Sequence, residues 1–285
     1  NDYLGCSITH RLYDNNAAAR IAQSIVLGIG GAKVVEALGG ADVYHMNEAH
    51  ALPLVFELFQ KHGDVEKVRE QVVFTTHTPV SAGNEVRNVY QLQKMGFFGN
   101  VPLDVVSKIT HTESEDFGYT PAALALSRGA NGVSQLHGQV AKEMWSHIKV
   151  KPEIIGITNA QHEGYWQDER LREALDSDND DAFRARKRVL KKRLFDIVAD
   201  QTGRLFDPDV LTIVWARRFA GYKRADLIMR DLTSFYKLLT AEQPIQILWA
   251  GKPYPEDDYA VDLFNRLIDL TRMCARAAVQ RRLDP

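Results

Sequence analysis

Apolar positions along the chain follow two patterns: helical spacing over long segments, and short apolar runs rich in β-branched residues between them. The short runs predict strands at residues 42–46, 71–75, 153–159, 211–216 and 245–251. Helical spacing predicts helices at residues 17–38, 48–61, 133–147, 181–199, 224–239 and 257–278, and a further helix is expected to start at Thr120, ahead of Pro121. Strands that alternate with helices in this order predict parallel, doubly wound sheets and the α/β class.

The order of elements also indicates two domains. With 285 residues, the chain is long enough for two moderate domains or for parts of two larger ones. The division is expected near residues 155–165, and we assign residues 1–158 to the first domain and residues 159–285 to the second. Because the chain begins with Asn rather than Met, we expect it to be a piece of a longer protein.

Composition and charge narrow the classes of partner. The hydrophobic fraction of 45% supports a packed core, and the formal net charge of −2 gives no general basic field that would collect nucleic acid. Any anion site must therefore be local. The cysteines, Cys6 and Cys274, form neither a disulfide framework nor a metal-binding pair, which suits a cytoplasmic protein. We find no signal peptide and no apolar run long enough to cross a membrane.

One cluster of cations follows a predicted strand directly. The apolar run LTIVWA, whose composition indicates a buried strand, leads into Arg217, Arg218, Lys223 and Arg224, with Tyr222 among them. The loop after a parallel strand opens onto the ligand crevice, and the amino end of the next helix favours anions. Arginine offers a planar fork for phosphate and lysine a point charge. The cluster indicates a phosphate site, and the alternative is a basic face that simply contacts water.

Two other predicted strands end in polar side chains. Asn47 and Glu48 end one strand, and His50 lies in the first turn of the helix that follows. Ligands of open α/β folds bind at such strand ends, but a histidine that caps its own helix would give the same pattern. A later strand ends in Asn159, followed by His162 and two aromatic residues. Amides beside aromatic faces suit sugars, and they also fit an ordinary turn between domains.

Two further motifs do not meet their requirements. LGIGGAK lacks both the last glycine of a dinucleotide loop and a preceding strand, so we interpret it as a closely packed helix. In HMNEAH, His45 and His50 lie five residues apart, whereas a zinc-binding helix needs a separation of four. We therefore expect no metal site.

Several segments taken together resemble one family, and they occur in order over nearly the whole chain. They are LYDNNAAARIAQSIVLGIGG, YHMNEAHA, FTTHTPVSAGNE, NGVSQLHG, GITNAQHEGYW, WARRFAGYKRADL and LWAGKPYP. The set resembles the α-glucan phosphorylases, which comprise the glycogen, starch and maltodextrin phosphorylases. The resemblance is closest to the shorter bacterial and archaeal branch.

The resemblance implies a GT-B architecture, with two Rossmann-like domains that face a cleft. Residues 1–158 would be the C-terminal part of the N-terminal domain, and residues 159–285 the first part of the C-terminal domain. The implied reaction is the retaining phosphorolysis of an α-1,4-glucan, such as glycogen or maltodextrin, by inorganic phosphate to release glucose 1-phosphate. The implied cofactor is pyridoxal 5′-phosphate, whose phosphate acts as the acid/base partner of the substrate phosphate.

The resemblance also assigns roles to single residues. Arg218 and Lys223 would be catalytic, because they would hold the substrate phosphate. Arg217 would lie near the cofactor phosphate and Tyr222 near the glucosyl unit. The positions that would bind the sugar, one from each domain, are His50 and Asn159.

The chain departs from the family pattern at several points. Ala49 and Ala160 stand where the family has glycine, and Gln161 replaces valine; alanine costs little there unless φ is positive. No segment resembles the Gly/Ser/Thr-rich stretch that carries the cofactor lysine, so we expect the chain alone to be inactive.

Two alternative functions stay open. One is another retaining GT-B glucan glycosyltransferase that uses a nucleotide sugar, and the other is a non-catalytic glucan-binding module. In each case we expect carbohydrate partners, no nucleic acid and no membrane. Homo-oligomer formation, preferred glucan length and allosteric control are not decided by the sequence.

Overall fold

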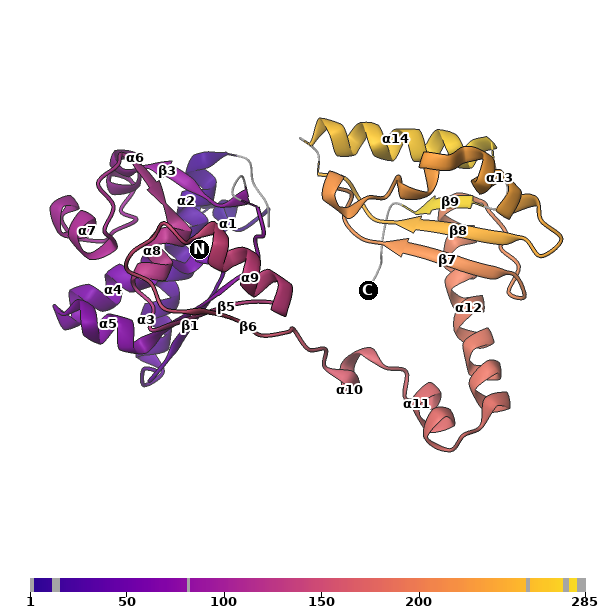
Figure 1. The fold of residues 1–285 in the computed structure, drawn as a ribbon, viewed down its shortest axis with the longest axis horizontal. Coiled ribbons are helices and arrows are strands. Elements are labelled where there is room, and N and C mark those ends of the chain that lie inside the picture. Colours follow the sequence, from indigo (N-terminus) through magenta and orange to yellow (C-terminus); the bar gives the residue numbers. More distant parts are fainter. Residues whose placement is uncertain (1–2, 12–15, 81–82, 255–256, 274–276, 281–285) are drawn as a thin grey trace. The chain divides into compact units, whose positions relative to one another are not determined.

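The computed structural model describes residues 3–11, 16–80, 83–254, 257–273 and 277–280. The chain divides into two compact units, Asn1–Ala160 (unit 1) and Gln161–Pro285 (unit 2). Each unit contains its own parallel sheet (Figure 1). The predicted α/β class with parallel sheets is thus confirmed. The assignment of the two parts to the N- and C-terminal domains of a phosphorylase stays a prediction.

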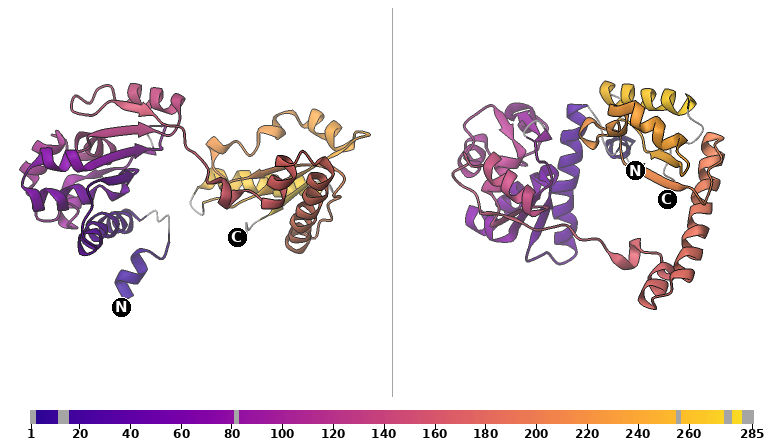
Figure 2. Two further views of the ribbon diagram at one scale, coloured as in Figure 1. Left: turned by 90° about the horizontal axis from the view of Figure 1, so that it is seen from below. Right: turned by 45° about the vertical axis from the view of Figure 1, so that its right-hand side comes forward.

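Unit 1 is built around four parallel strands in the order β1-β2-β5-β6, which lie side by side (Figure 2). The strands are β1 (Tyr44–Asn47), β2 (Val72–Thr76), β5 (Gly129–Gly132) and β6 (Ile154–Gly156). A separate antiparallel pair consists of β3 (Val86–Asn88) and β4 (Asp116–Gly118). The sequence predicts β1, β2 and β6 within a few residues. It misses β5, because the sequence GANG has no apolar run.

The predicted helices of unit 1 are present with bounds that differ by a few residues, and the unit also contains helices that the sequence did not predict. They are α1 (Tyr3–Ile8), α2 (Ala17–Ile25), η1 (Val26–Gly30), α3 (Gly31–Ala37), η2 (Ala49–Ala51), α4 (Pro53–His62), α5 (Val65–Gln71), α6 (Val89–Lys94), α7 (Leu103–Thr110), α8 (Tyr119–Ala125) and α9 (Gln135–Met144). The expected capping role of Thr120 is wrong, because α8 starts one residue earlier and Gly118 precedes it. Thr120 Oγ1 instead donates to Asn84 Oδ1 over 2.7 Å.

The helices α2 and α3 are joined by the π turn η1 (Val26–Gly30) into one continuous helical rod (indigo in Figure 2, right). The buried side chains on one face of the rod are those of Ile21, Ser24 and Ala32, and η1 packs against α4. The rod spans Ala17–Ala37, and by length and composition these 21 residues could cross a membrane. This finding corrects the expectation that no such run exists. A core helix of a soluble protein or a signal sequence meets the same criterion.

The motif NGVSQLHG forms the turn from β5 into α9. Ser134 caps α9 by accepting a hydrogen bond from the His137 N–H over 3.0 Å. The glycines Gly132, Gly138 and Gly156 lie against one another, so that a Cβ on Gly138 would lie 2.8 Å from Gly156 Cα. Side chains at these positions would push α9 away from β5 and β6. The motif is therefore needed for close packing of the helix on the strands.

Unit 2 contains three parallel strands in the order β7-β8-β9. They are β7 (Leu211–Ala216), β8 (Ile245–Ala250) and β9 (Ala277–Gln280). The helices are α10 (Glu163–Trp166), α11 (Glu169–Asp176), α12 (Asp180–Thr202), η4 (Gly221–Lys223), η5 (Leu227–Asp231), α13 (Leu232–Thr240) and α14 (Asp258–Met273). Two predictions are wrong here. The helix expected from residue 224 begins as α13 at Leu232, and residues 277–278 belong to β9 rather than to the preceding helix.

The strands of unit 2 differ in their exposure. All six residues of β8 are buried, because the strand lies between β7 and β9. Ile245, Ile247 and Trp249 face α13 and α14, and Leu248 belongs to a cluster with residues of α12 on the other face. β7 lies at the edge of this sheet and is largely exposed, so the expectation that LTIVWA is buried is wrong for the residues that the structure describes.

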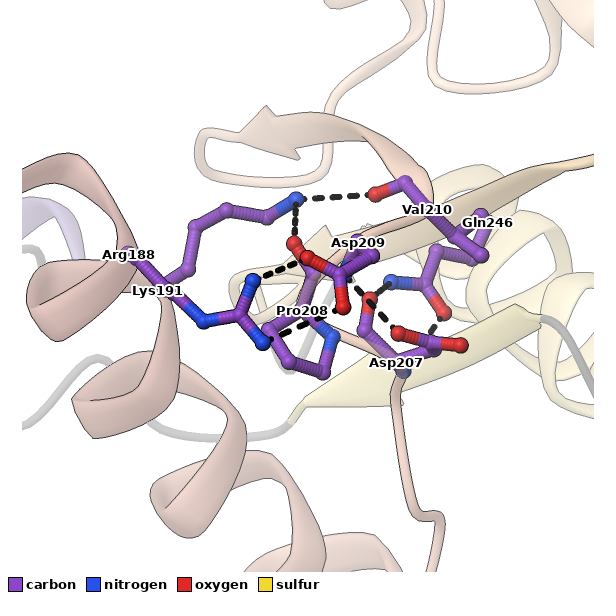
Figure 3. Close-up of polar contacts among 7 residues, drawn as sticks. All are labelled: Arg188, Lys191, Asp207, Pro208, Asp209, Val210 and Gln246. Carbon is purple, nitrogen blue, oxygen red and sulfur yellow. Dashed lines mark hydrogen bonds and ion pairs between the residues drawn. The ribbon is translucent and has the colours of Figure 1, made fainter. Parts of the chain in front are cut away.

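A network of polar contacts holds α12 to the segment just before β7 (Figure 3). Lys191 Nζ donates to the carbonyl oxygens of Pro208 and Val210 over 2.6 and 2.8 Å. The guanidinium of Arg188 pairs with both carboxylate oxygens of Asp209. These bonds fix the position at which β7 begins.

Candidate functional site

The predicted cation cluster lies on a loop at the carboxyl end of β7, and its backbone is bonded to the neighbouring strand end. Arg217 N–H donates to Ala250 O and Phe219 N–H donates to Lys252 O, each over 3.0 Å. Gly251 has φ +154°, and a Cβ at this position would clash with the carbonyl group of Arg217. The glycine of the AGK motif is thus required for close approach of the cationic loop.

Buried side chains hold the rest of this loop. Phe219 is fully buried and Ala225 nearly so. The indole N–H groups of two tryptophans on adjacent strands donate to loop carbonyls: Trp215 to Lys223 O over 3.2 Å, and Trp249 to Ala225 O over 3.0 Å. The loop is therefore shaped before any ligand arrives.

The origin of the positive potential differs from the prediction. We expected the amino end of a long helix at this loop, but residues Gly221–Lys223 form a 3₁₀ turn and α13 begins only at Leu232. Arg224 adopts the left-handed conformation with φ 54°, which ends the turn. Because the helix dipole acts only near the first turn, the cationic side chains supply most of the positive charge here.

Three of the predicted residues meet at the loop. Arg218 Nη2 donates to Tyr222 Oη in a long hydrogen bond of 3.5 Å, and Lys223 Nζ lies 4.7 Å from the centre of the Tyr222 ring. Partial burial acts to raise the pKa of Tyr222, but the hydrogen bond from Arg218 and the charges of Lys223 and Arg218 outweigh it and lower that pKa. Arg217 is exposed beside them. The arrangement presents several cationic donors around one phenol, which suits a phosphate with a polar neighbour.

Unit 1 has a polar row along the carboxyl ends of its parallel strands. His45 Nε2 lies 2.7 Å from Thr75 Oγ1, and this hydroxyl donates to Asn131 Oδ1 over 2.6 Å. Since the hydroxyl has a single proton, His45 Nε2 carries the hydrogen in the first bond. The row crosses β1, β2 and β5, the edge at which ligands of open α/β sheets bind.

Glu48 is strained at the end of β1. Its φ of 63° and ψ of 171° lie in a region that is almost restricted to glycine. The carboxylate accepts hydrogen bonds from the His77 N–H and from Thr78 Oγ1. His77 Nε2 lies 2.5 Å from Asn47 Oδ1. His77 was not predicted as a site residue, although a histidine directly after a buried strand was the available signal.

His50 lines a cavity of about 320 Å³ in unit 1. Glu85 lies in the wall, where it pairs with Arg20 and, over 2.7 Å, with Arg87. Burial and the negative charge of Glu85 raise the pKa of Tyr119, so its phenol stays protonated. The remaining residues that line the cavity are Thr9, Arg11, Gln23, Ser24 and Leu27.

Asn159 lies at the end of unit 1, whereas the sequence assigned it to the second domain. Its backbone N–H donates to Val133 O over 3.1 Å, and its side chain is exposed.

Neither Ala49 nor Ala160 has a positive φ, so alanine causes no backbone strain at these two positions. Within the described residues, no three His, Cys, Asp or Glu side chains form a group that could hold a metal ion. That His50 and Asn159 bind the sugar stays a prediction.

Comparison with known proteins gives relatives over nearly the whole chain. An uncharacterized protein of Methanocaldococcus jannaschii is 47% identical over 272 residues, which cover 95% of this chain and 51% of that protein. The maltodextrin phosphorylase of Thermococcus litoralis is 29% identical over 317 residues, covering 94% of this chain and 38% of the enzyme. The glycogen phosphorylase of Mycobacterium tuberculosis is 30% identical over 344 residues, covering 97% of this chain and 40% of the enzyme.

The chain spans about half the length of the curated relatives it matches, or less. Both phosphorylase alignments are longer than this chain of 285 residues, so those enzymes carry extra residues between the matched segments. No family model matches the chain. The similarity to enzymes of the same kind nevertheless covers nearly the whole chain. These relatives support the resemblance of the chain to the glycogen and maltodextrin phosphorylases.

Proposed function

We propose that this chain forms part of an enzyme that cleaves α-1,4-glucans with inorganic phosphate and releases glucose 1-phosphate with retention of configuration. The observation that carries the proposal is the cationic loop after β7, which buried Phe219 and the indole bonds of Trp215 and Trp249 hold in place. Relatives named maltodextrin phosphorylase and glycogen phosphorylase support the same reaction class.

In this proposal Arg218 and Lys223 bind the substrate phosphate, which accepts the glucosyl group. The planar guanidinium of Arg218 offers two parallel donors to phosphate oxygens, and Lys223 adds a point charge. Because the loop is fixed in advance, little reorganisation is needed when negative charge develops on the phosphate. We assign Tyr222, whose hydroxyl accepts a hydrogen bond from Arg218, to the binding of the glucosyl unit.

The sugar side of the proposal rests on His50. Its cavity of about 320 Å³ lies within the range of roughly 300–1,000 Å³ that is typical of small-molecule sites. The wall contains hydroxyl, amide, guanidinium and carboxylate groups, which suit the hydroxyls of a glucan. Asn159 contributes an exposed amide just after β6, near the carboxyl end of the parallel sheet of unit 1.

Pyridoxal 5′-phosphate fits the described residues only in part. Arg217 provides an exposed guanidinium for its phosphate. The nearby lysines are unsuited to the imine: Lys223 Nζ lies over the Tyr222 ring, and Lys252 follows the strand without a Gly/Ser/Thr-rich cradle. We therefore propose that the cofactor lysine is not in this chain. Borohydride reduction with the cofactor, followed by peptide mapping, should give no single stoichiometrically modified lysine.

Phosphate and glucose 1-phosphate binding to the chain, followed by ³¹P NMR titration, tests the assignment. Arg218→Lys replaces the planar fork by a point charge and should cost roughly 1.5–3 kcal/mol, about tenfold or more in affinity. Arg224→Lys in the same loop is the matched control and should leave the affinity nearly unchanged. Equal, small losses at both positions would support a basic face that only contacts water. Tighter binding of a nucleotide sugar than of glucose 1-phosphate would favour a nucleotide-sugar transferase.

A further inference from the structure

The segment that follows β6 is held by backbone hydrogen bonds although it belongs to no strand. Ile157 N–H donates to Gly132 O over 2.9 Å, and Asn159 N–H donates to Val133 O over 3.1 Å. Both bonds join the segment to the place where β5 ends and the turn into α9 begins. The backbone position of Asn159 is therefore set by this turn.

The bond from Asn159 departs from a regular parallel ladder. Bonds in such a ladder are evenly spaced and advance by two residues on each strand, so the next acceptor along β5 would be Ser134 O. That carbonyl instead accepts the first helical bond of α9, from Gly138 N–H over 2.8 Å. The amide of Asn159 consequently bonds one residue earlier, to Val133 O. Its place thus depends on where the turn holds Val133.

The imidazole of His137 holds Val133 at its N–H group. The ring atom Nδ1 accepts this N–H over 3.1 Å. Because Nδ1 accepts, the neutral ring carries its hydrogen on Nε2. His137 is only 8% exposed, and its Nε2 is buried and makes no hydrogen bond among the described residues. An unbonded buried donor lowers stability, so Nδ1 is the atom that favours histidine over an apolar side chain at this position.

We propose that His137 is a positioning residue, which sets the place of Asn159 at the carboxyl edge of the unit 1 sheet. The path consists of two hydrogen bonds, from Val133 N–H to the imidazole and from Asn159 N–H to Val133 O. The side chain of Asn159 is exposed, so its place follows from the backbone that carries it. The consequence for sugar binding rests on the proposed function, whereas the positioning does not.

The alternative is that His137 only caps α9. In a capping box, the side chain of the third helical residue reaches back to the N–H of the N-cap residue. His137 is the third residue of α9 and Ser134 is the N-cap, but the imidazole accepts from Val133, one residue farther back. The bond therefore acts on the residue that also holds Asn159, not on the end of the helix.

Hydrogen exchange of the Asn159 amide, followed by NMR in the 285-residue chain, tests the positioning. His137→Leu removes the acceptor and should speed this exchange about tenfold or more. His137→Asn, whose Oδ1 lies near the former Nδ1, should restore the protection. Ser134→Ala is the matched control, because it removes the other side-chain bond of the turn and leaves both bonds of Val133 in place. Unchanged exchange in His137→Leu, or an equal acceleration in Ser134→Ala, would overturn the proposal.

A second variant covers the case in which His137→Leu does not fold. His137→Gln keeps a polar side chain but places its oxygen near the former Nε2 rather than near Nδ1. The Asn159 amide should then exchange faster in His137→Gln than in His137→Asn. Equal protection of this amide in the two variants would overturn the proposal.

Maltose titration by calorimetry tests the consequence for binding. Asn159→Ala and His137→Leu should each weaken maltose binding by roughly two- to tenfold, the worth of one neutral hydrogen bond. The double variant should bind no more weakly than Asn159→Ala, because the effect of His137 passes through Asn159. Losses that multiply in the double variant would overturn the positioning role. If Asn159→Ala leaves maltose binding unchanged, the proposed function of Asn159 fails, whereas the exchange of its amide still decides the positioning.

Discussion

Gly251→Ala should damage the cationic loop more than alanine at Gly164, Gly203 or Gly221, the other glycines of unit 2. The new Cβ would lie 2.9 Å from the carbonyl carbon of Arg217 and closer still to its oxygen. The carbonyl cannot move away freely, because hydrogen bonds from Arg217 N–H to Ala250 and from Phe219 N–H to Lys252 hold the loop on either side. The φ of +154° at residue 251 is also unfavourable for alanine.

The expected cost follows from these two effects. Forcing a methyl group into a filled space costs about 1–3 kcal/mol. A residue with a Cβ in a glycine-only conformation costs roughly 1–3 kcal/mol more. We therefore expect the free energy of unfolding of unit 2 to fall by roughly 2–6 kcal/mol. Affinity for phosphate should fall as well, because Arg217 and Arg218 are carried by the displaced backbone.

Urea unfolding followed by tryptophan fluorescence measures the stability change, and ³¹P NMR measures phosphate binding. Gly203→Ala is the matched control: Gly203 also has a positive φ, of 69°, but a Cβ there would meet no atom within 4 Å. It should show only the conformational cost and normal phosphate binding. If Gly251→Ala proved no more harmful than Gly203→Ala, then contact with Arg217 would not be what shapes the loop.

Three further substitutions test separate contacts. Trp249→Phe should lower the free energy of unfolding by about 1–3 kcal/mol in urea titrations, because Ala225 O loses its donor. Glu48→Gly should leave the protein about 1–3 kcal/mol more stable than Glu48→Ala, since both remove the carboxylate but only glycine relieves the backbone strain. Asp168 accepts hydrogen bonds from Arg186, which lower its pKa from 3.8 to about 2. Its stabilisation is therefore present above about pH 4 and lost as the pH falls toward 2, so Asp168→Asn should differ from the original chain at pH 7 and converge with it at low pH.

The sequence predicts the longer helices and most of the apolar strands, because strand and helix periods are local properties. β7 was predicted with the bounds that the structure shows, and β8 within one residue. β5 was missed because the small residues of GANG are selected by close packing with α9, which is a tertiary property. The burial of β7 was wrong because periodicity shows which residues are apolar, not which strand lies at the edge of the sheet.

The candidate site could be predicted only as a set of residue types. The sequence shows that Arg217, Arg218 and Lys223 follow a strand, and the structure confirms that they lie on one loop. The helix that was expected to begin at this loop starts eight residues later than predicted, because Arg224 takes a left-handed conformation that periodicity cannot show. The bonds from the tryptophan indoles join residues that lie 8 and 24 positions apart.

Most residues in the matched motifs have a structural role, and only a few present chemistry. In NGVSQLHG, glycines and a capping serine set the approach of α9 to the sheet, and in LWAGKPYP, Gly251 admits the carbonyl of Arg217. The loop ARRFAGYKR combines both kinds of residue, since Phe219 is fully buried while Arg218 is exposed. Conserving the structural residues alone would preserve this backbone in a protein without the cationic side chains. Under the proposed function, substrate binding would therefore depend on Arg218, Tyr222 and Lys223 rather than on the motif as a whole.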